Sequence, residues 1–64
     1  MLVPIESLNP GDRFIDLDPN PHLDVTFTVK GTDDNGRIVA EDEYGYEFHF
    51  HGLKIVRILS KSEF

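Results

Sequence analysis

Proline and glycine interrupt this chain at short intervals, and such spacing favours short extended segments over helices. Between the interruptions, apolar and polar residues alternate: residues 25–30 are Val-Thr-Phe-Thr-Val-Lys, and residues 46–51 are Tyr-Glu-Phe-His-Phe-His. Alternation with a period of two places one set of side chains on each face of a β-strand. The sequence therefore predicts an all-β protein.

The alternating segments are separated by residue types that favour chain reversal. We expect five strands, at residues 12–17, 25–30, 37–41, 46–51 and 53–59. Tight turns are predicted at residues 9–12 (Asn-Pro-Gly-Asp), 33–36 (Asp-Asp-Asn-Gly) and 42–45 (Asp-Glu-Tyr-Gly). Residues 18–24 include Pro19 and Pro21, which favour a loop, and residues 60–64 are predicted to form a polar tail.

Five short strands joined in sequence order into a flat antiparallel sheet would leave one apolar face in water. Curling the sheet into a small barrel buries that face and reduces the number of free strand edges. We therefore predict a single domain over residues 1–64, folded as a small five-stranded antiparallel SH3-like barrel. An OB-like barrel is the alternative, although that fold normally needs a longer chain and a helix between strands.

The segment that leads into the first predicted strand supports this fold. Ile5 and Leu8 are spaced for one turn of helix with a single buried side. Residues 8–14, Leu-Asn-Pro-Gly-Asp-Arg-Phe, resemble the Leu-x-Pro-Gly-Asp-x-Phe opening of many small bacterial and phage SH3-like barrels. The resemblance implies the barrel and no particular activity, because small barrels serve many unrelated functions. The compact, accessory character of the chain also resembles small phage-encoded proteins.

The composition limits where such a domain works and how it is stabilised. With 64 residues and no cysteine, the chain has neither a disulfide nor a cysteine-based zinc site, and it is stabilised by packing or by a second copy. A homo-oligomer is therefore one hypothesis. The N-terminus lacks the basic and long apolar regions of a signal peptide, and no segment has the roughly 20 apolar residues of a membrane helix. We expect a cytoplasmic protein with no membrane partner.

The formal net charge is −6, from twelve acidic and six basic residues. A surface with this balance repels phosphate backbones, so direct nucleic-acid binding is disfavoured. An acidic patch is predicted from residues Asp33, Asp34, Glu41, Asp42 and Glu43. Such a patch supports one alternative function, an acidic mimic of nucleic acid that inhibits a basic enzyme.

The segment 46–51 raises a metal-binding alternative. Glu47, His49 and His51 are two residues apart, so they share one face of a strand, and both imidazoles could reach one zinc ion. The opposite face has Tyr46, Phe48 and Phe50, which we expect in the core. The three polar side chains then face water, which explains their pattern without a metal. We expect no cofactor, with zinc as the alternative.

Carboxylate pairs at Asp16 and Asp18, and at Glu41 and Glu43, are spaced as catalytic acids could be. A general acid needs a desolvating pocket, and a filled barrel of this size has little room for one. The sequence contains no convincing nucleophile set and no glycine-rich phosphate loop. We therefore expect no enzymatic activity.

The last predicted strand has apolar residues on both of its faces, with Leu53, Ile55 and Leu59 on one and Val56 and Ile58 on the other. Either one set covers a partner or a bulge changes the facing. We predict an interaction surface of Tyr44, Leu53, Ile55, Arg57 and Leu59. The expected function is a non-enzymatic protein-interaction module, a bacterial or phage accessory protein that binds a host or partner protein.

Overall fold

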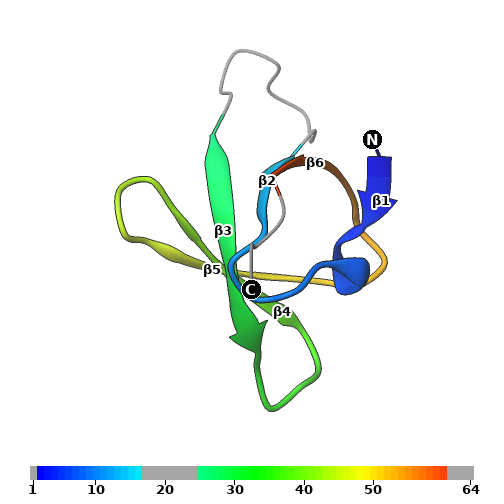
Figure 1. The fold of residues 1–64 in the computed structure, drawn as a ribbon. Helices are drawn as coiled ribbons and strands as arrows, with labels where there is room; N and C mark the ends of the chain where they lie inside the picture. The colour runs from blue at the N-terminus through cyan, green and yellow to red at the C-terminus, as the bar shows by residue number, and fades with distance from the viewer. Residues whose placement is uncertain (1, 17–24, 61–64) are drawn as a thin grey trace.

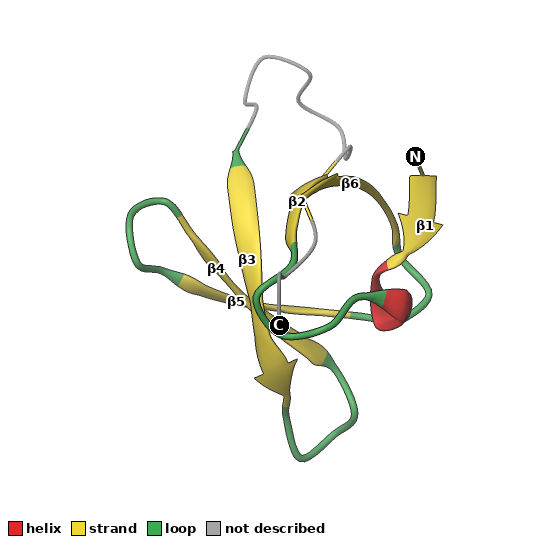
Figure 2. Cartoon of the chain, in the orientation of Figure 1, coloured by secondary structure: helices red, strands yellow, loops and turns green. Residues whose placement is uncertain are grey.

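A computed structural model describes residues 2–16 and 25–60 of the chain (Figure 1). The strands are β1 (Leu2–Pro4), β2 (Arg13–Asp16), β3 (Thr26–Thr32), β4 (Ile38–Asp42), β5 (Glu47–Phe50) and β6 (Ile55–Ser60). One turn of 3₁₀-helix, η1 (Ile5–Ser7), follows β1, and the described residues contain no α-helix (Figure 2). The all-β prediction is confirmed. No helix within the described ranges is long and apolar enough to cross a membrane.

All six strands belong to one antiparallel sheet with the order β1-β6-β2-β3-β4-β5. Strands β2 to β5 are neighbours in sequence order, and the predicted tight turns join β3 to β4 and β4 to β5. The last strand departs from that order, because β6 pairs with β1 and β2 and not with β5. The described residues thus form six strands where the sequence predicted five. The added strand is β1, which pairs through Leu2–Pro4 with the outer edge of β6. The predicted loop 18–24 lies outside the described residues.

The segment between β1 and β2 has the predicted turn of helix. Ile5 and Leu8 are buried, as expected from their spacing. The backbone N–H groups of Ile5 and Glu6 donate hydrogen bonds to the carbonyls of Lys54 and Gly52, at 2.8 and 3.0 Å. These bonds fix η1 against the connection between β5 and β6, so η1 covers one end of the core.

The residues of the Leu-x-Pro-Gly-Asp-x-Phe motif have structural roles. The N–H of Asp12 donates to the carbonyl of Asn9 at 3.0 Å, which closes the predicted turn. The Asp12 carboxylate is buried and accepts a hydrogen bond from the N–H of Asn9 at 2.8 Å. Phe14, two residues later, is fully buried. The motif therefore forms a turn that leads into β2 and places Phe14 in the core.

The β3–β4 turn is organised by the side chain of Asp33. Its Oδ1 accepts hydrogen bonds from the N–H groups of Asn35 and Arg37, at 2.8 and 2.9 Å. The chain reverses with Gly36 at a φ of 79°, a conformation that costs glycine little because it has no Cβ. The N–H of Asp33 donates a hydrogen bond to the carbonyl of Arg37, next to the backbone hydrogen bonds that pair β3 with β4.

The β4–β5 turn repeats the same construction. Oδ1 of Asp42 accepts hydrogen bonds from the N–H groups of Tyr44 and Tyr46, both at 2.9 Å. Gly45 has a φ of 88°. Both turns combine an aspartate that caps the backbone with a glycine three residues later, which is why the sequence predicted them correctly.

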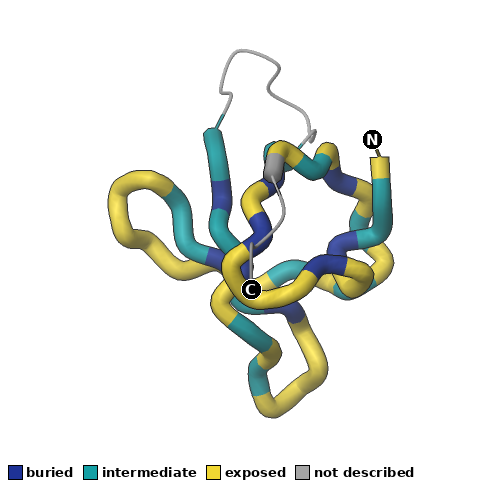
Figure 3. Tube along the Cα trace, in the orientation of Figure 1, coloured by how far each residue is buried: buried dark blue, intermediate teal, exposed yellow. Residues whose placement is uncertain are grey.

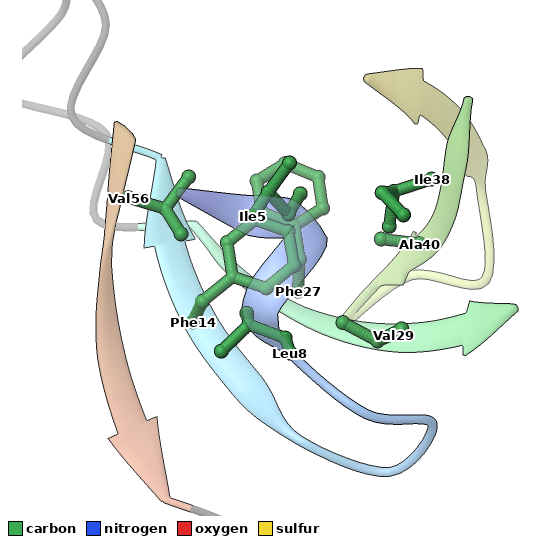
Figure 4. Close-up of a cluster of buried hydrophobic side chains, with 8 residues drawn as sticks. All are labelled: Ile5, Leu8, Phe14, Phe27, Val29, Ile38, Ala40 and Val56. Atoms are coloured by element: carbon green, nitrogen blue, oxygen red, sulfur yellow. The ribbon is translucent and has the colours of Figure 1, made fainter. Parts of the chain in front are cut away.

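The core is a compact cluster of side chains that point toward one another from the four strands β2, β3, β4 and β6, from η1 and from the residue after it (Figure 4). Its buried members are Ile5, Leu8, Phe14, Phe27, Val29, Ile38, Ala40 and Val56. The rings of Phe14 and Phe27 are stacked, with their centroids 5.4 Å apart. The Phe50 ring packs edge-on against both, at centroid distances of 5.7 Å from Phe14 and 5.3 Å from Phe27. Aromatic pairs in these arrangements add to the stabilisation from burial alone.

The expectation that Tyr46, Phe48 and Phe50 all enter the core is wrong for the first two. Tyr46 is 67% exposed and Phe48 is 42% exposed, while Phe50 is half-buried against the core. The reason is position: β5 is an edge strand, and the β4–β5 turn extends away from the core at the left of Figure 3. Phe48 retains an edge-on contact with Phe27 at 5.4 Å.

Candidate protein-interaction surface

Residues 55–59 of β6 alternate in burial, although the pairing with β2 has a register shift at Leu59, where Phe14 lies opposite Ile58 and Arg13 opposite Ser60. Val56 is fully buried and Ile58 is half-buried against the core. Ile55, Arg57 and Leu59 are exposed. The structure thus decides which apolar set of this strand enters the core. The other set, which the sequence assigned to an interaction surface, lies on the outside.

The strands on both sides of β6 extend this apolar surface. Arg57 is paired with Leu2 of β1 on one side and with Ile15 of β2 on the other. Residues that are directly opposite in an antiparallel pair project from the same face of the sheet. Pro4, opposite Ile55, belongs to the same face. We define the β6 outer face as Leu2, Pro4, Ile15, Ile55, Arg57 and Leu59.

Sequence reasoning found half of the β6 outer face. It missed Leu2 and Pro4 because it treated the first residues as a lead-in and not as a strand. Residues 2–4 are all apolar, so no alternation marked them as a strand, although in the structure Val3 packs on the core. Ile15 was not assigned to an interaction surface, because its neighbours across the sheet could not be deduced from the sequence.

Two predicted members of the interaction surface lie elsewhere. Tyr44 is exposed in the β4–β5 turn, and strands β2 and β3 separate β6 from the hairpin that contains it. The structure therefore does not bring Tyr44 together with Arg57. Leu53 is exposed in the turn that precedes β6. It adds apolar surface close to Ile55, although it is not part of the strand.

The predicted metal ligands are engaged in separate contacts. His49 Nδ1 lies 2.7 Å from Asp33 Oδ2, and His51 Nδ1 accepts a hydrogen bond from the N–H of Leu53 at 3.2 Å. Glu47 is exposed and lies opposite Glu41 in the β4–β5 pairing. Across residues 2–16 and 25–60, no three His, Cys, Asp or Glu side chains gather as a metal site.

The contact between His49 and Asp33 ties β5 to the β3–β4 turn. The hydrogen bond with His49, followed by those from the N–H groups of Arg37 and Asn35, holds the pKa of the Asp33 carboxyl below its usual value. Both carboxylate oxygens of Asp33 therefore take part in hydrogen bonds, Oδ1 with the turn backbone and Oδ2 with His49. This arrangement gives Asp33 and His49 a structural role in holding the sheet together.

The predicted acidic patch is divided between the two ends of β4. Asp33 and Asp34 belong to the β3–β4 turn, and Glu41, Asp42 and Glu43 lie at or beyond the other end of the strand. Several of these acids have local partners. Oε2 of Glu41 lies 4.0 Å from Nζ of Lys30, and Oε1 of Glu43 accepts a hydrogen bond from the N–H of Thr26 at 3.3 Å. The sequence cluster does not form one continuous acidic surface.

The candidate catalytic carboxylates also have other contacts. Asp16 pairs with Lys54 at 3.2 Å, and Nζ of Lys54 lies 5.6 Å from the centre of the Phe50 ring. Asp18 lies outside the described residues. Glu41 pairs with Lys30, as described above. These are surface ion pairs. One joins β2 to the turn before β6, and the other joins β3 to β4.

Comparison with known proteins found no matching protein-family model, no matching curated protein and no matching solved structure. The functional argument therefore rests on the surface itself.

Proposed function

We propose that this chain is a small non-enzymatic protein-interaction module, which docks on another protein through the β6 outer face. The observation that carries the proposal is the continuity of exposed aliphatic side chains there: Leu2, Ile55 and Leu59 are exposed on adjacent strands of one sheet. Small soluble domains rarely expose a contiguous apolar face unless it is used for binding. The predicted cytoplasmic location and the role as a bacterial or phage accessory protein are parts of the same proposal.

We further propose that the sheet belongs to the SH3-like barrel class. Two features support this assignment: residues 8–14 have the expected opening, and the last strand returns to pair with β2. The OB-like alternative is less well supported, because the described residues include no α-helix between strands.

Two other functions have weaker support. A zinc site at Glu47, His49 and His51 would have to break the contact between His49 and Asp33. An acidic mimic of nucleic acid would have to work from two groups of acids at opposite ends of β4, and Asp33 and Asp42 also cap their own turns. The β6 outer face needs no such rearrangement before it can bind.

The test is capture from a lysate of the cells that encode the protein, with two variants of the tagged chain as comparison. Leu59→Ser removes an exposed side chain of the β6 outer face, and Asp34→Ser, in the exposed β3–β4 turn, is the matched control. We expect a stoichiometric partner that is retained by the control and lost with Leu59→Ser. An unchanged set of captured proteins with Leu59→Ser would contradict the proposal, as would the absence of any captured protein.

A further inference from the structure

In this acidic protein, the described residues provide no carboxylate partner for Arg57. The chain has twelve acidic residues against six basic ones. The two described lysines, Lys30 and Lys54, each lie within 4.0 Å of a carboxylate. Within residues 2–16 and 25–60, no ion pair involves Arg57, which is exposed. No carboxylate of residues 2–16 and 25–60 neutralises this charge, which a molecule covering the face would meet.

The side chains next to Arg57 on its own strand and directly across from it are aliphatic, and Arg13, exposed on β2 two residues before Ile15, lies on the same face of the sheet. Leu2 and Ile15 lie directly across from it on the two neighbouring strands. Ile55 and Leu59 precede and follow it by two residues on β6, so they share its face. The Arg57 guanidinium therefore has four aliphatic neighbours, Leu2, Ile15, Ile55 and Leu59, and shares its face of the sheet with Arg13.

This arrangement is suited to a carboxylate that arrives with apolar neighbours. A guanidinium donates two parallel hydrogen bonds to a carboxylate, and it is more weakly hydrated than an ammonium group. Apolar contacts around the pair would exclude water, which strengthens the electrostatic attraction. Arginine surrounded by residues that exclude water is a frequent energetic centre of protein interfaces.

We propose that Arg57 is the anchor of the β6 outer face, and that its partner is a protein segment with one carboxylate between aliphatic or aromatic side chains. This inference rests on the proposed function and specifies the chemistry of the partner. A long acidic tract fits less well, because the net charge of −6 would repel it. A single carboxylate gains the contact with Arg57 and adds little repulsion.

A second copy of the chain fits this face poorly. In a two-fold symmetric interface the same surface patch meets itself. Arg57 lies at the centre of its patch, so it would approach the equivalent arginine of the other copy. Like charges at the centre of an interface are unfavourable unless a counterion joins them. The β6 outer face is therefore better suited to a different protein than to self-association.

The test is selection of binders from a displayed random-peptide library on the folded, full-length protein. We expect the wild type to enrich peptides with an aspartate or glutamate between apolar residues. A synthetic version of such a peptide should lose about tenfold or more in affinity for Arg57→Gln, and it should lose binding to Leu59→Ser. Arg37→Gln is the matched control, because Arg37 is exposed in the β3–β4 turn and outside the β6 outer face. It should bind like the wild type.

Charge reversal provides the sharper arm of the experiment. Selection on Arg57→Glu should enrich lysine or arginine in place of the acidic residue. The inference is overturned by a failure to enrich peptides, by enriched peptides without an acidic residue, or by equal losses for Arg57→Gln and Arg37→Gln. Binding that is lost with Leu59→Ser but unchanged with Arg57→Gln would overturn only the role of Arg57 and would leave the proposed function standing. Circular dichroism of each variant verifies that it is folded.

Discussion

Two neighbouring residues of β6 give a sharp test of its facing, which the whole account of the surface requires. Val56 is fully buried, whereas Ile55 is 50% exposed on the β6 outer face. Val56→Ala removes two buried methyl groups, which costs about 2 kcal/mol once the cavity is included. Ile55→Ala removes one carbon atom more, yet we expect it to cost less than about 1 kcal/mol because half of the side chain stays in water.

Thermal unfolding followed by far-ultraviolet circular dichroism measures the melting temperature of both variants against that of the wild type. In a domain of this size, 2 kcal/mol corresponds to a fall in melting temperature of about 10 °C. We therefore expect a clearly lower melting temperature for Val56→Ala and a small change for Ile55→Ala. The reverse order would refute the reasoning, because a slip of β6 by one residue would exchange its two faces.

Three further predictions concern the turns and the histidines. Gly45→Ala should cost about 1 kcal/mol of unfolding free energy, because Gly45 has a φ of 88° that alanine adopts only with strain; a melting temperature equal to that of the wild type would contradict this. His49→Ala should raise the pKa of Asp33 toward its usual value in a carboxyl-carbon NMR titration, since the hydrogen bond with His49 is the largest cause of the lowered value; no change would show that the contact does not form in solution. Because the pKa of Asp33 is lowered by folding, its contribution to stability is present at neutral pH and lost as the pH falls through the folded-state pKa. Micromolar zinc should leave the melting temperature unchanged, because His49 is engaged by Asp33; a rise that His49→Ala abolishes would establish the metal-binding alternative instead.

The local features of this fold were predictable from the sequence because their causes are local. Asp33 and Asp42, each followed by glycine three residues later, specify the two hairpin turns through their own side chains and backbones. Alternation in residues 25–30 puts Phe27 and Val29 on the same face of the strand, and both are buried in the structure. The one-turn helix with Ile5 and Leu8 inside follows from their spacing alone.

The features that the sequence did not reveal depend on which strands become neighbours. Alternation in residues 46–51 separates aromatic from polar side chains, but it does not say whether another element covers the aromatic face. Phe48 remains partly exposed because β5 is an edge strand. The aliphatic neighbours of Arg57 on the adjacent strands could not be predicted for the same reason. Leu2 and Ile15 lie next to Arg57 only because β6 pairs with both β1 and β2.

The most direct test of the central claim is site-specific photo-crosslinking in the cells that encode the protein. A photoreactive amino acid is introduced in place of Leu59 on the β6 outer face or, as the control, in place of Glu47, which is exposed on β5. The account predicts a discrete adduct with another protein from position 59 and none from position 47. Adducts of equal yield at both positions, or an adduct from position 47 alone, would contradict it.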